Sequence, residues 1–279
     1  MLAGPQSARV KAVRRLHRRA SREKARRFLA EGPQAVREAL AAGSVLELFA
    51  TAAALGRHGA LVEQAEANGA DVRFVSDDAM ASLATTVTPQ GLVAVCPFTD
   101  LGLDDVLPDG AGLVAVLVHV RDPGNAGTVI RSADAAGADG VVLTEESVDL
   151  YNPKCVRSAA GSLFHLPVVS GASLTSALAA FRAAGLQVLA ADASGPVSLD
   201  DAGQALLAAP TAWLFGNEAR GLPAHVADDA DAVIRIPIHG RAESLNLSVS
   251  TALCMYATAG AQRRAARVVR HREGSQPVT

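Results

Sequence analysis

The residues best suited to chemistry lie where two apolar runs end in polar loops. The first run covers residues 212–215 and is followed by a glycine, an amide and a carboxylate, which are Gly216, Asn217 and Glu218. The second run covers residues 232–238 and leads to the polar loop 243–248. Apolar runs of this length indicate buried strands, and open α/β sheets bind ligands where their strands end in loops. The pattern predicts a small-molecule site formed by these two loops.

A third strand end supplies an amide and a guanidinium. The apolar run 113–118 leads through a loop into a helix, for which we expect Asn125 to be the N-cap. The helical period puts Arg131 about 165° from the apolar face of that helix. Its guanidinium should therefore point away from the sheet, where it could bind an anion. Taken alone, this position is more typical of an ordinary solvent-facing arginine.

Several common kinds of site are excluded by the sequence. There is no dinucleotide-binding glycine pattern, no P-loop, no H-E-x-x-H pair and no G-x-S-x-G turn. The three cysteines are scattered and the histidines show no ligand spacing, so we expect neither a disulfide framework nor a metal site.

The length of 279 residues allows one large or two modest domains. Alternating strand and helix patterns predict a small α/β domain over 22–98, and a Pro-, Gly- and Asp-rich linker over 99–112. Continuous apolar strands then predict a second α/β domain over 113–269, with a parallel sheet covered on both faces. The remaining segments are a basic N-terminal arm, 1–21, and a C-terminal tail, 270–279. No apolar run is long enough to span a membrane and no secretory leader is evident, so we expect a cytoplasmic protein.

Positive charge is concentrated at the two ends of the chain. Residues 9–27 contain ten Lys and Arg side chains against Glu23 alone, and residues 263–273 contain five Arg against Glu273. Basic clusters on an otherwise acidic chain favour contact with nucleic acid, although a solvated tail that aids solubility has the same composition. The side chains that we expect to contact RNA are Arg9, Arg14, Arg15, Arg18, Arg19, Arg22, Lys24, Arg26 and Arg27.

Three ordered stretches together resemble a known family. The stretches are 125–131 (NAGTVIR), 215–221 (FGNEARG), and 236–238 (IPI) with 243–248 (ESLNLS). They resemble the three signature motifs of the SpoU/TrmH-type RNA 2′-O-ribose methyltransferases of the SPOUT superfamily. The N-terminal stretches 28–33 (FLAEGP) and 88–92 (TPQGL) are similar to the substrate-binding domain that often precedes the catalytic domain in that family. The resemblance covers about residues 22–265.

The resemblance implies a fold and partners that composition cannot show. The catalytic domain would be an α/β SPOUT domain with a parallel sheet and a deep C-terminal trefoil knot, in which the C-terminal segment threads a loop. A small α/β RNA-binding domain of the ribosomal-protein type would precede it. The family binds S-adenosyl-L-methionine in the knot and forms a homodimer through the catalytic domains. The motif match gives cofactor contacts at Leu214, Phe215, Gly216, Asn217, Ile236, Ile238, Ser244, Leu245 and Asn246.

The implied reaction is the transfer of a methyl group to a ribose 2′-OH. By motif match, the catalytic set is Asn125, Arg131, Glu218, Ser244 and Asn246. A guanidinium resists deprotonation, so we expect Arg131 to stabilise the developing alkoxide or to hold the adjacent phosphate. Glu218 would orient Arg131 or the RNA, unless it is only a carboxylate favoured by the start of a helix. Ser244 and Asn246 would position the cofactor.

Three alternatives stay open at the level of the sequence. The chain could be a catalytically silent RNA-binding homologue, although the intact catalytic set argues against this. It could also be an α/β enzyme that binds a sugar or nucleotide rather than RNA. Within the methyltransferase class, we favour ribosomal RNA of the 23S type, including the kind of methylation that gives thiostrepton resistance, over tRNA.

Overall fold

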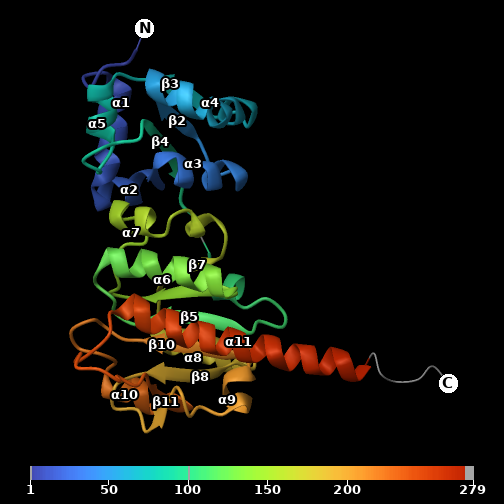
Figure 1. The fold of residues 1–279 in the computed structure, drawn as a ribbon. Coiled ribbons are helices and arrows are strands. Elements are labelled where there is room, and N and C mark those ends of the chain that lie inside the picture. The colour runs from blue at the N-terminus through green and yellow to red at the C-terminus, as the bar shows by residue number, and fades with distance from the viewer. Residues whose placement is uncertain (1, 100, 274–279) are drawn as a thin grey trace, which may run out of the picture. The chain divides into compact units, whose positions relative to one another are not determined.

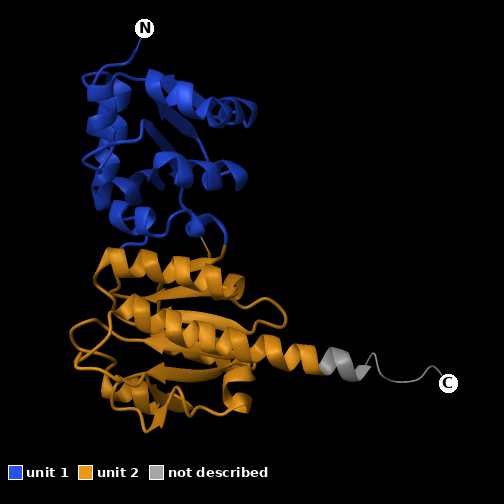
Figure 2. Cartoon of the chain, in the orientation of Figure 1, with its two compact units in different colours: residues 1–100, 149–165 blue, residues 101–148, 166–279 orange. Residues whose placement is uncertain are grey.

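The chain divides into two compact units (Figure 2), each described by itself. The computed structural model describes residues 2–99 and 101–273. Unit 1 consists of residues 1–100 and 149–165, and unit 2 of residues 101–148 and 166–279. The segment 149–165, which the sequence assigned to the second domain, is therefore part of the first unit.

Unit 1 contains a four-stranded mixed sheet in the order β1-β4-β2-β3. Strand β4 pairs antiparallel with both β1 and β2, and β2 pairs parallel with β3. The strands are β1 (Arg27–Glu31), β2 (Glu47–Ala50), β3 (Asp71–Phe74) and β4 (Leu92–Pro97). The helices are α1 (Ala8–Arg14), η1 (Arg15–His17), α2 (Arg19–Ala25), α3 (Gly32–Ala41), α4 (Ala52–Ala67), α5 (Asp77–Leu83), α7 (Pro153–Ser158) and η3 (Ser162–Phe164).

The basic N-terminal stretch is folded rather than extended as an arm. Ser7 caps α1 by accepting a hydrogen bond from the backbone N–H of Val10. Val10, Val13 and Leu16 are buried in one apolar cluster with residues of the sheet and of α5. Charge alone suggested an arm over 1–21, but the apolar residues between the bases have helical spacing and give the stretch a core-facing side.

Strand β1 leads directly into the helix α3. Residues Arg27–Glu31 form a strand, and the helix α3 begins only at Gly32, whose φ is +87°. The register pairs Phe28 with Cys96. The aromatic ring of Phe28 also packs against Tyr151, with ring centroids 4.6 Å apart, and Tyr151 stacks on Phe98 at 3.8 Å. These ring contacts join segment 149–165 to unit 1.

Unit 2 contains a seven-stranded sheet in the order β7-β6-β5-β10-β8-β11-β9. Every pairing in it is parallel, which confirms the predicted α/β class with a parallel sheet. The strands are β5 (Leu113–Leu117), β6 (Gly140–Thr144), β7 (Val168–Ala172), β8 (Gln187–Ala191), β9 (Val197–Ser198), β10 (Thr211–Phe215) and β11 (Ala232–Arg235). The helices are η2 (Leu103–Val106), α6 (Pro123–Ala136), α8 (Leu174–Ala183), α9 (Gln204–Ala208), α10 (Ala224–Asp228) and α11 (Leu247–Glu273).

Helices cover both faces of this sheet (Figure 1). On one face, Phe181 of α8 and Val226 of α10 join the buried core that includes Val116 and Leu214. On the other face, α6 and α11 pack together, and α11 also contacts β5 and β10. The buried Trp213 of β10 donates from Nε1 to Thr258 Oγ1 of α11 at 2.9 Å. Alternate residues of the central strand therefore fix two different layers of helices.

The ends of the helices in unit 2 differ slightly from expectation. Helix α6 begins at Pro123, and its N-cap is Asp122, whose side chain accepts from the backbone N–H of Asn125. A proline in the first turn is typical because it needs no hydrogen-bond acceptor there. Helix α11 continues to Glu273; the rest of the expected tail, 274–279, lies outside the described residues.

Two further observations concern membrane-spanning helices and the reactivity of the cysteines. No helix among the described residues is long and apolar enough to cross a membrane. Burial raises the pKa of the Cys96 thiol above its ordinary value, and it raises the pKa of Cys254 to about 12. Both thiols therefore stay protonated near neutral pH and are poor nucleophiles.

Candidate functional site

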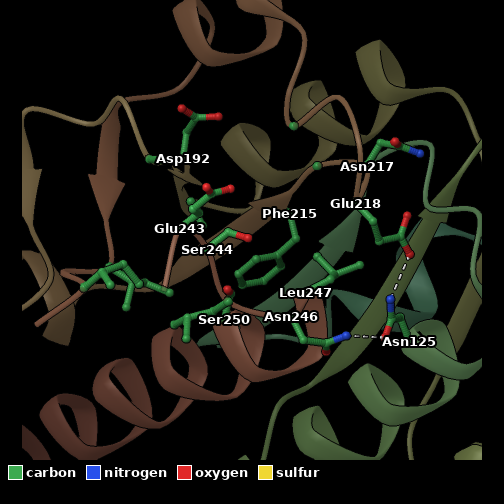
Figure 3. Close-up of a pocket in the computed structure, with 17 residues that line it drawn as sticks. Asn125, Asp192, Phe215, Asn217, Glu218, Glu243, Ser244, Asn246, Leu247 and Ser250 are labelled. Carbon is green, nitrogen blue, oxygen red and sulfur yellow. Dashed lines mark hydrogen bonds between the residues drawn. The ribbon is translucent and has the colours of Figure 1, made fainter. Parts of the chain in front are cut away.

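A pocket of about 480 Å³ lies in unit 2, beyond the carboxyl ends of β8, β10 and β11 (Figure 3). The loop 243–247 and the first turns of α6 and α11 complete its wall. This is the edge at which a parallel sheet leaves a crevice for ligands, and the volume falls in the range of pockets for small ligands. The two loops that the sequence singled out do meet here.

The lining of the pocket is acidic. Asp192, Glu218 and Glu243 contribute carboxylates, and none of the 17 residues that line the pocket is Lys, Arg or His. Apolar surface comes from Phe215, from Ile236 and Ile238, and from Leu245 and Leu247. A ligand with positive charge and an apolar ring would match this lining better than an anion.

A chain of hydrogen bonds connects the three motif segments at one side of the pocket. Asn125 Nδ2 donates to Glu218 Oε1 at 3.1 Å, and Asn246 Nδ2 donates to Asn125 Oδ1 at 3.0 Å (Figure 3). The Glu218 carboxylate also accepts from the backbone N–H groups of Arg121 and Asp122, at 3.4 and 3.3 Å. Asn125 thus links the other two segments, because its side-chain amide offers both a donor and an acceptor.

The loop after β10 is held by its own amide side chain. Asn217 Oδ1 accepts from the backbone N–H groups of Ala219 and Arg220, and Asn217 Nδ2 donates to the His119 carbonyl at 2.9 Å. The backbones of Asn217 and Gly221 exchange two hydrogen bonds. This closure brings the chain back against Gly216, where a Cβ atom would lie 2.3 Å from the carbonyl carbon of Gly221. Only glycine fits at position 216.

Asn246 joins the pocket to the start of the long helix α11. Its Oδ1 accepts from Ser248, both from the backbone N–H at 2.9 Å and from Oγ at 2.6 Å. The side chain is therefore fixed at both ends, because its Nδ2 already donates to Asn125.

Most of the sequence-predicted site residues surround this one pocket. Those that line it are Asn125, Phe215, Gly216, Asn217, Glu218, Ile236, Ile238, Ser244, Leu245 and Asn246. Two do not. Leu214 is fully buried in the core on the α8 side of the sheet. Arg131 is exposed on α6, six residues beyond Asn125, and is not among the lining residues.

Sequence reasoning missed part of the wall. Asp192, with its neighbours Ala191 and Ala193, enters from the end of β8, and Ser250 enters from α11. Asp192 also accepts at Oδ1 from the Ser194 N–H and hydroxyl groups. The available signal was a carboxylate directly after the apolar run 188–191, much as Glu218 lies three residues after the run 212–215.

Eight of the ten Lys and Arg side chains of residues 9–27 fall into two groups. Four are paired with carboxylates: Arg9 and Arg27 with Glu47, Arg19 with Glu23, and Arg22 with Asp149. Arg22 is also only 3% exposed, so the structure removes it from the surface that could contact RNA. Lys24 is exposed, and Arg26 lies over the ring of Phe98, 4.6 Å from the centroid.

The second group gathers around a cavity of about 400 Å³ on α1 and η1. All five of its lining residues are basic or imidazole side chains: Lys11, Arg14, Arg15, His17 and Arg18. Among the residues that the structure describes, the four Lys and Arg side chains of this basic cavity have no carboxylate partner. Unpaired cations around a hollow favour a phosphate group.

Family models match both parts of the chain. Residues 112–256 match the family model described as the SpoU rRNA Methylase family, and residues 7–94 match the MRM3-like substrate binding domain. The chain is 34% identical over 247 residues to the 23S rRNA (guanosine(2553)-2′-O)-methyltransferase RlmP of Bacillus subtilis, covering 88% of this chain and 94% of that protein.

Two solved structures are similar over almost the whole chain. The AdoMet-bound rRNA methyltransferase from Sinorhizobium meliloti superposes with a TM-score of 0.81 at 32% identity, covering 94% of this chain and 98% of that one. The SpoU methyltransferase AviRb from Streptomyces viridochromogenes, in complex with AdoMet, gives 0.82 at 29% identity, covering 93% of this chain and 100% of that one.

Proposed function

Because the chain belongs to the SpoU rRNA methylase family, we propose that it transfers a methyl group from S-adenosylmethionine to a ribose 2′-OH of ribosomal RNA. The observation that carries the proposal is the acidic pocket, around which the loops of three sequence motifs are tied together by Asn125, Glu218 and Asn246. The names of relatives such as RlmP, a 23S rRNA methyltransferase, support the choice of large-subunit ribosomal RNA.

The residues of the pocket fit S-adenosylmethionine. Its sulfonium and ammonium groups are cations, and the lining offers three carboxylates and no basic side chain. Ile236, Ile238 and Leu245 provide apolar surface for an adenine ring, and Phe215, Gly216, Asn217, Ser244 and Asn246 provide polar and backbone groups beside it. The bound cofactor would supply an electrophilic methyl group.

The chain must supply the groups that hold and activate the RNA. A ribose hydroxyl gains negative charge as it loses its proton to water or to a group of the bound cofactor, and a preorganised cation stabilises such charge. We assign this role to Arg131, whose planar guanidinium is suited to such contacts and which lies on the exposed side of the helix that carries Asn125. Glu218 and Asn125 keep the start of that helix in position through their hydrogen bond, and Ser244 lies on the opposite loop of the pocket.

The basic cavity on α1 and η1 is our candidate contact for RNA phosphates. His17 Nε2 lies 2.9 Å from the carbonyl oxygen of Leu83, so it donates there and the ring is fixed. The side chains of Arg14, Arg15 and Arg18, which have no carboxylate partner among the described residues, line the same cavity as His17. Phosphate contacts of this kind provide affinity and orientation without reading the sequence.

We further propose that the protein works as a homodimer through unit 2. Val249, Leu253 and Tyr256 are 44–52% exposed and recur at helical spacing along α11. Such an exposed apolar stripe is typical of a subunit interface. A charge in its centre, Leu253→Glu, should convert the dimer to monomers in analytical ultracentrifugation, whereas an unchanged sedimentation coefficient would exclude this interface. We also propose that unit 2 contains the deep C-terminal knot of the family.

The decisive test is a methyl-transfer assay followed by mapping of the modified nucleotide. Purified protein with S-adenosylmethionine should methylate a ribose 2′-OH in unmodified 23S rRNA, and the same position should lack the methyl group in cells without the gene. Modification of tRNA instead would move the assignment to a tRNA enzyme. Cofactor binding without transfer to any RNA would indicate a silent homologue. A ribosomal substrate also fits the expected cytoplasmic location.

A further inference from the structure

Unit 1 contains a second cavity, separate from the basic cavity, that the methyl-transfer proposal does not use. Its volume is about 350 Å³, and its wall comes from the end of β1, the start of α3, the loop before β4, and α7. The two N-terminal motif stretches meet at it: Glu31 and Gly32 belong to residues 28–33, and Thr88, Pro89 and Gln90 belong to residues 88–92. The two N-terminal motif stretches therefore lie at the same cavity, and do not merely belong to the same domain.

The central group of this cavity is a buried carboxylate with one unused oxygen. The Glu31 side chain is 7% exposed. Its Oε1 accepts from the Thr85 backbone N–H at 2.9 Å and from Thr85 Oγ1 at 2.7 Å. Its Oε2 is buried and has no hydrogen-bond partner within the described part of the chain. A buried carboxylate oxygen without a donor is unfavourable, so a ligand that donates a hydrogen bond to it would be stabilised.

The neighbouring arginine does not satisfy that oxygen. Arg157 Nη1 lies 4.0 Å from Glu31 Oε2, beyond hydrogen-bond distance, and donates instead to Thr85 Oγ1 at 2.7 Å. The Arg157 side chain lines the cavity and is 40% exposed. Its planar guanidinium is thus partly exposed beside the cavity, and such groups stack on nucleobases.

The rest of the wall can hydrogen-bond the other atoms of a planar polar ring. Gln90 carries an amide, Thr86 and Thr88 carry hydroxyl groups, and the first turn of α3 contributes Gln34 and Ala35. Gln90 lies close to the start of α3, because a Cβ atom on Gly32 would be 2.9 Å from Gln90 Oε1. The cavity thus presents one strong acceptor beside several neutral donors and acceptors.

We propose that this cavity binds a single nucleobase of the substrate RNA, unstacked from its strand, with an exocyclic amino group donating to Glu31 Oε2. The inference rests on the proposed RNA substrate and adds base recognition to it. Sequence-specific RNA recognition commonly uses unstacked bases, read by hydrogen bonds at their edges. A phosphate is a poor candidate, because Glu31 would repel it. Adenine, cytosine and guanine carry the required amino group, and uracil does not.

The test compares two variants of the full-length protein that lose the same charge. Glu31→Gln keeps one oxygen for Thr85 and puts an NH₂ group where the unused acceptor was. The control, Glu38→Gln, lies on α3, the helix that directly follows Glu31, and the carboxylate that it removes contacts His165 at 3.2 Å outside the cavity wall. Loss of a negative charge by itself should strengthen RNA binding in both variants. Weaker RNA binding by Glu31→Gln would therefore have to come from the lost acceptor and not from the change in charge.

Binding is measured by fluorescence anisotropy, without S-adenosylmethionine, to a labelled uridine oligonucleotide with one variable central position. We expect wild-type protein to bind about tenfold more tightly when that position is adenosine, cytidine or guanosine than when it is uridine or abasic, as a hydrogen bond to a charged group warrants. Glu31→Gln should lose the preference, and Glu38→Gln should keep it.

Three results would overturn the proposal: equal wild-type affinity for all central positions, a preference that survives in Glu31→Gln, or an equal loss in Glu38→Gln. The wild-type comparison needs no substitution, so it tests the proposal even if a variant fails to fold. Cofactor binding by calorimetry is measured alongside and should match wild type in both variants. A failure of methyl transfer would leave the anisotropy result intact, so the two proposals can fail separately.

Discussion

Glu218 accepts a hydrogen bond from the side-chain amide of Asn125 at 3.1 Å, across a sequence separation of 93 residues. The carboxylate also accepts from two backbone N–H groups in the turn that precedes α6. With three donors on one exposed side chain, the loop after β10 is tied to the start of the helix that carries Arg131. We interpret Glu218 as a positioning residue for that helix.

Glu218→Gln should therefore lower the rate of methyl transfer more than it lowers cofactor affinity. A glutamine has one acceptor oxygen, so at least one of the three donors loses its partner. We expect kcat to fall roughly ten- to hundredfold, because charge-assisted hydrogen bonds contribute about 1.5–3 kcal/mol, with a smaller rise in KM for S-adenosylmethionine. Glu146→Gln, at an exposed ion pair with Arg121, is the control. A pure KM effect would assign Glu218 to cofactor binding instead.

Gly216→Ala should abolish tight cofactor binding. Its new Cβ atom would overlap the backbone of Gly221, and overpacking of this kind costs about 1–3 kcal/mol. Isothermal titration calorimetry should then give a Kd roughly ten- to hundredfold weaker. The matched control is Gly240→Ala, since nothing lies within 4 Å of a Cβ atom there. Equal affinities for the two variants would show that the turn at 216 does not shape the binding site.

Arg131→Ala should stop methyl transfer while leaving cofactor binding intact. The side chain does not line the pocket, so its removal leaves the lining unchanged, and loss of a stabilising donor costs roughly a hundredfold or more in rate. Single-turnover kinetics with saturating RNA measure the rate, and calorimetry measures the affinity. Arg131→Lys, which keeps the charge but not the planar fork, should recover part of the rate. Undiminished turnover in Arg131→Ala would remove this residue from the reaction.

The basic cavity should account for much of the salt dependence of RNA binding. Replacing Arg14, Arg15 and Arg18 with Ala should weaken RNA binding. It should also reduce the magnitude of the slope of log K against log salt concentration by about 2, because each lost contact with a single-stranded phosphate removes about 0.7 from the slope. Arg19→Ala, whose exposed partner is Glu23, should change the slope little. An unchanged slope in the triple variant would show that these cations are only solvated. Deletion of residues 1–27 is a poor substitute, because Val10, Val13 and Leu16 belong to the core.

The sequence was sufficient to predict the parallel sheet of unit 2 and most of the pocket. Strand ends at 215 and 235 reach the solvent through short loops, so local patterns mark them directly. Asp192 was missed because its loop belongs to none of the motifs, although β8 lies next to β10. Leu214 was expected in the pocket, but alternation along a strand turns it to the opposite face from Phe215.

Features that depend on distant pairing were not predictable. Strand β1 forms because residues 27–31 pair with 93–97, and nothing local distinguishes it from the start of α3. The burial of Arg22 depends on Asp149, which is 127 residues further along the chain. Likewise, the unused oxygen of Glu31 becomes visible only when Thr85 and Arg157 are in place around it.

The order of strands in unit 2 has a consequence for how the protein is made. Strand β10 lies at the middle of the sheet, where Thr211 pairs with both Leu113 and Gln187, yet most of the unit precedes it in the chain. During synthesis, the edges of β5 and β8 that pair with β10 stay unpaired until β10 has left the ribosome. Contacts this remote in sequence fold slowly, and exposed edges aggregate. The methyl-donor pocket is therefore among the last parts of the polypeptide to acquire its shape, and stalled or truncated chains should be captured by chaperones rather than bind ligand.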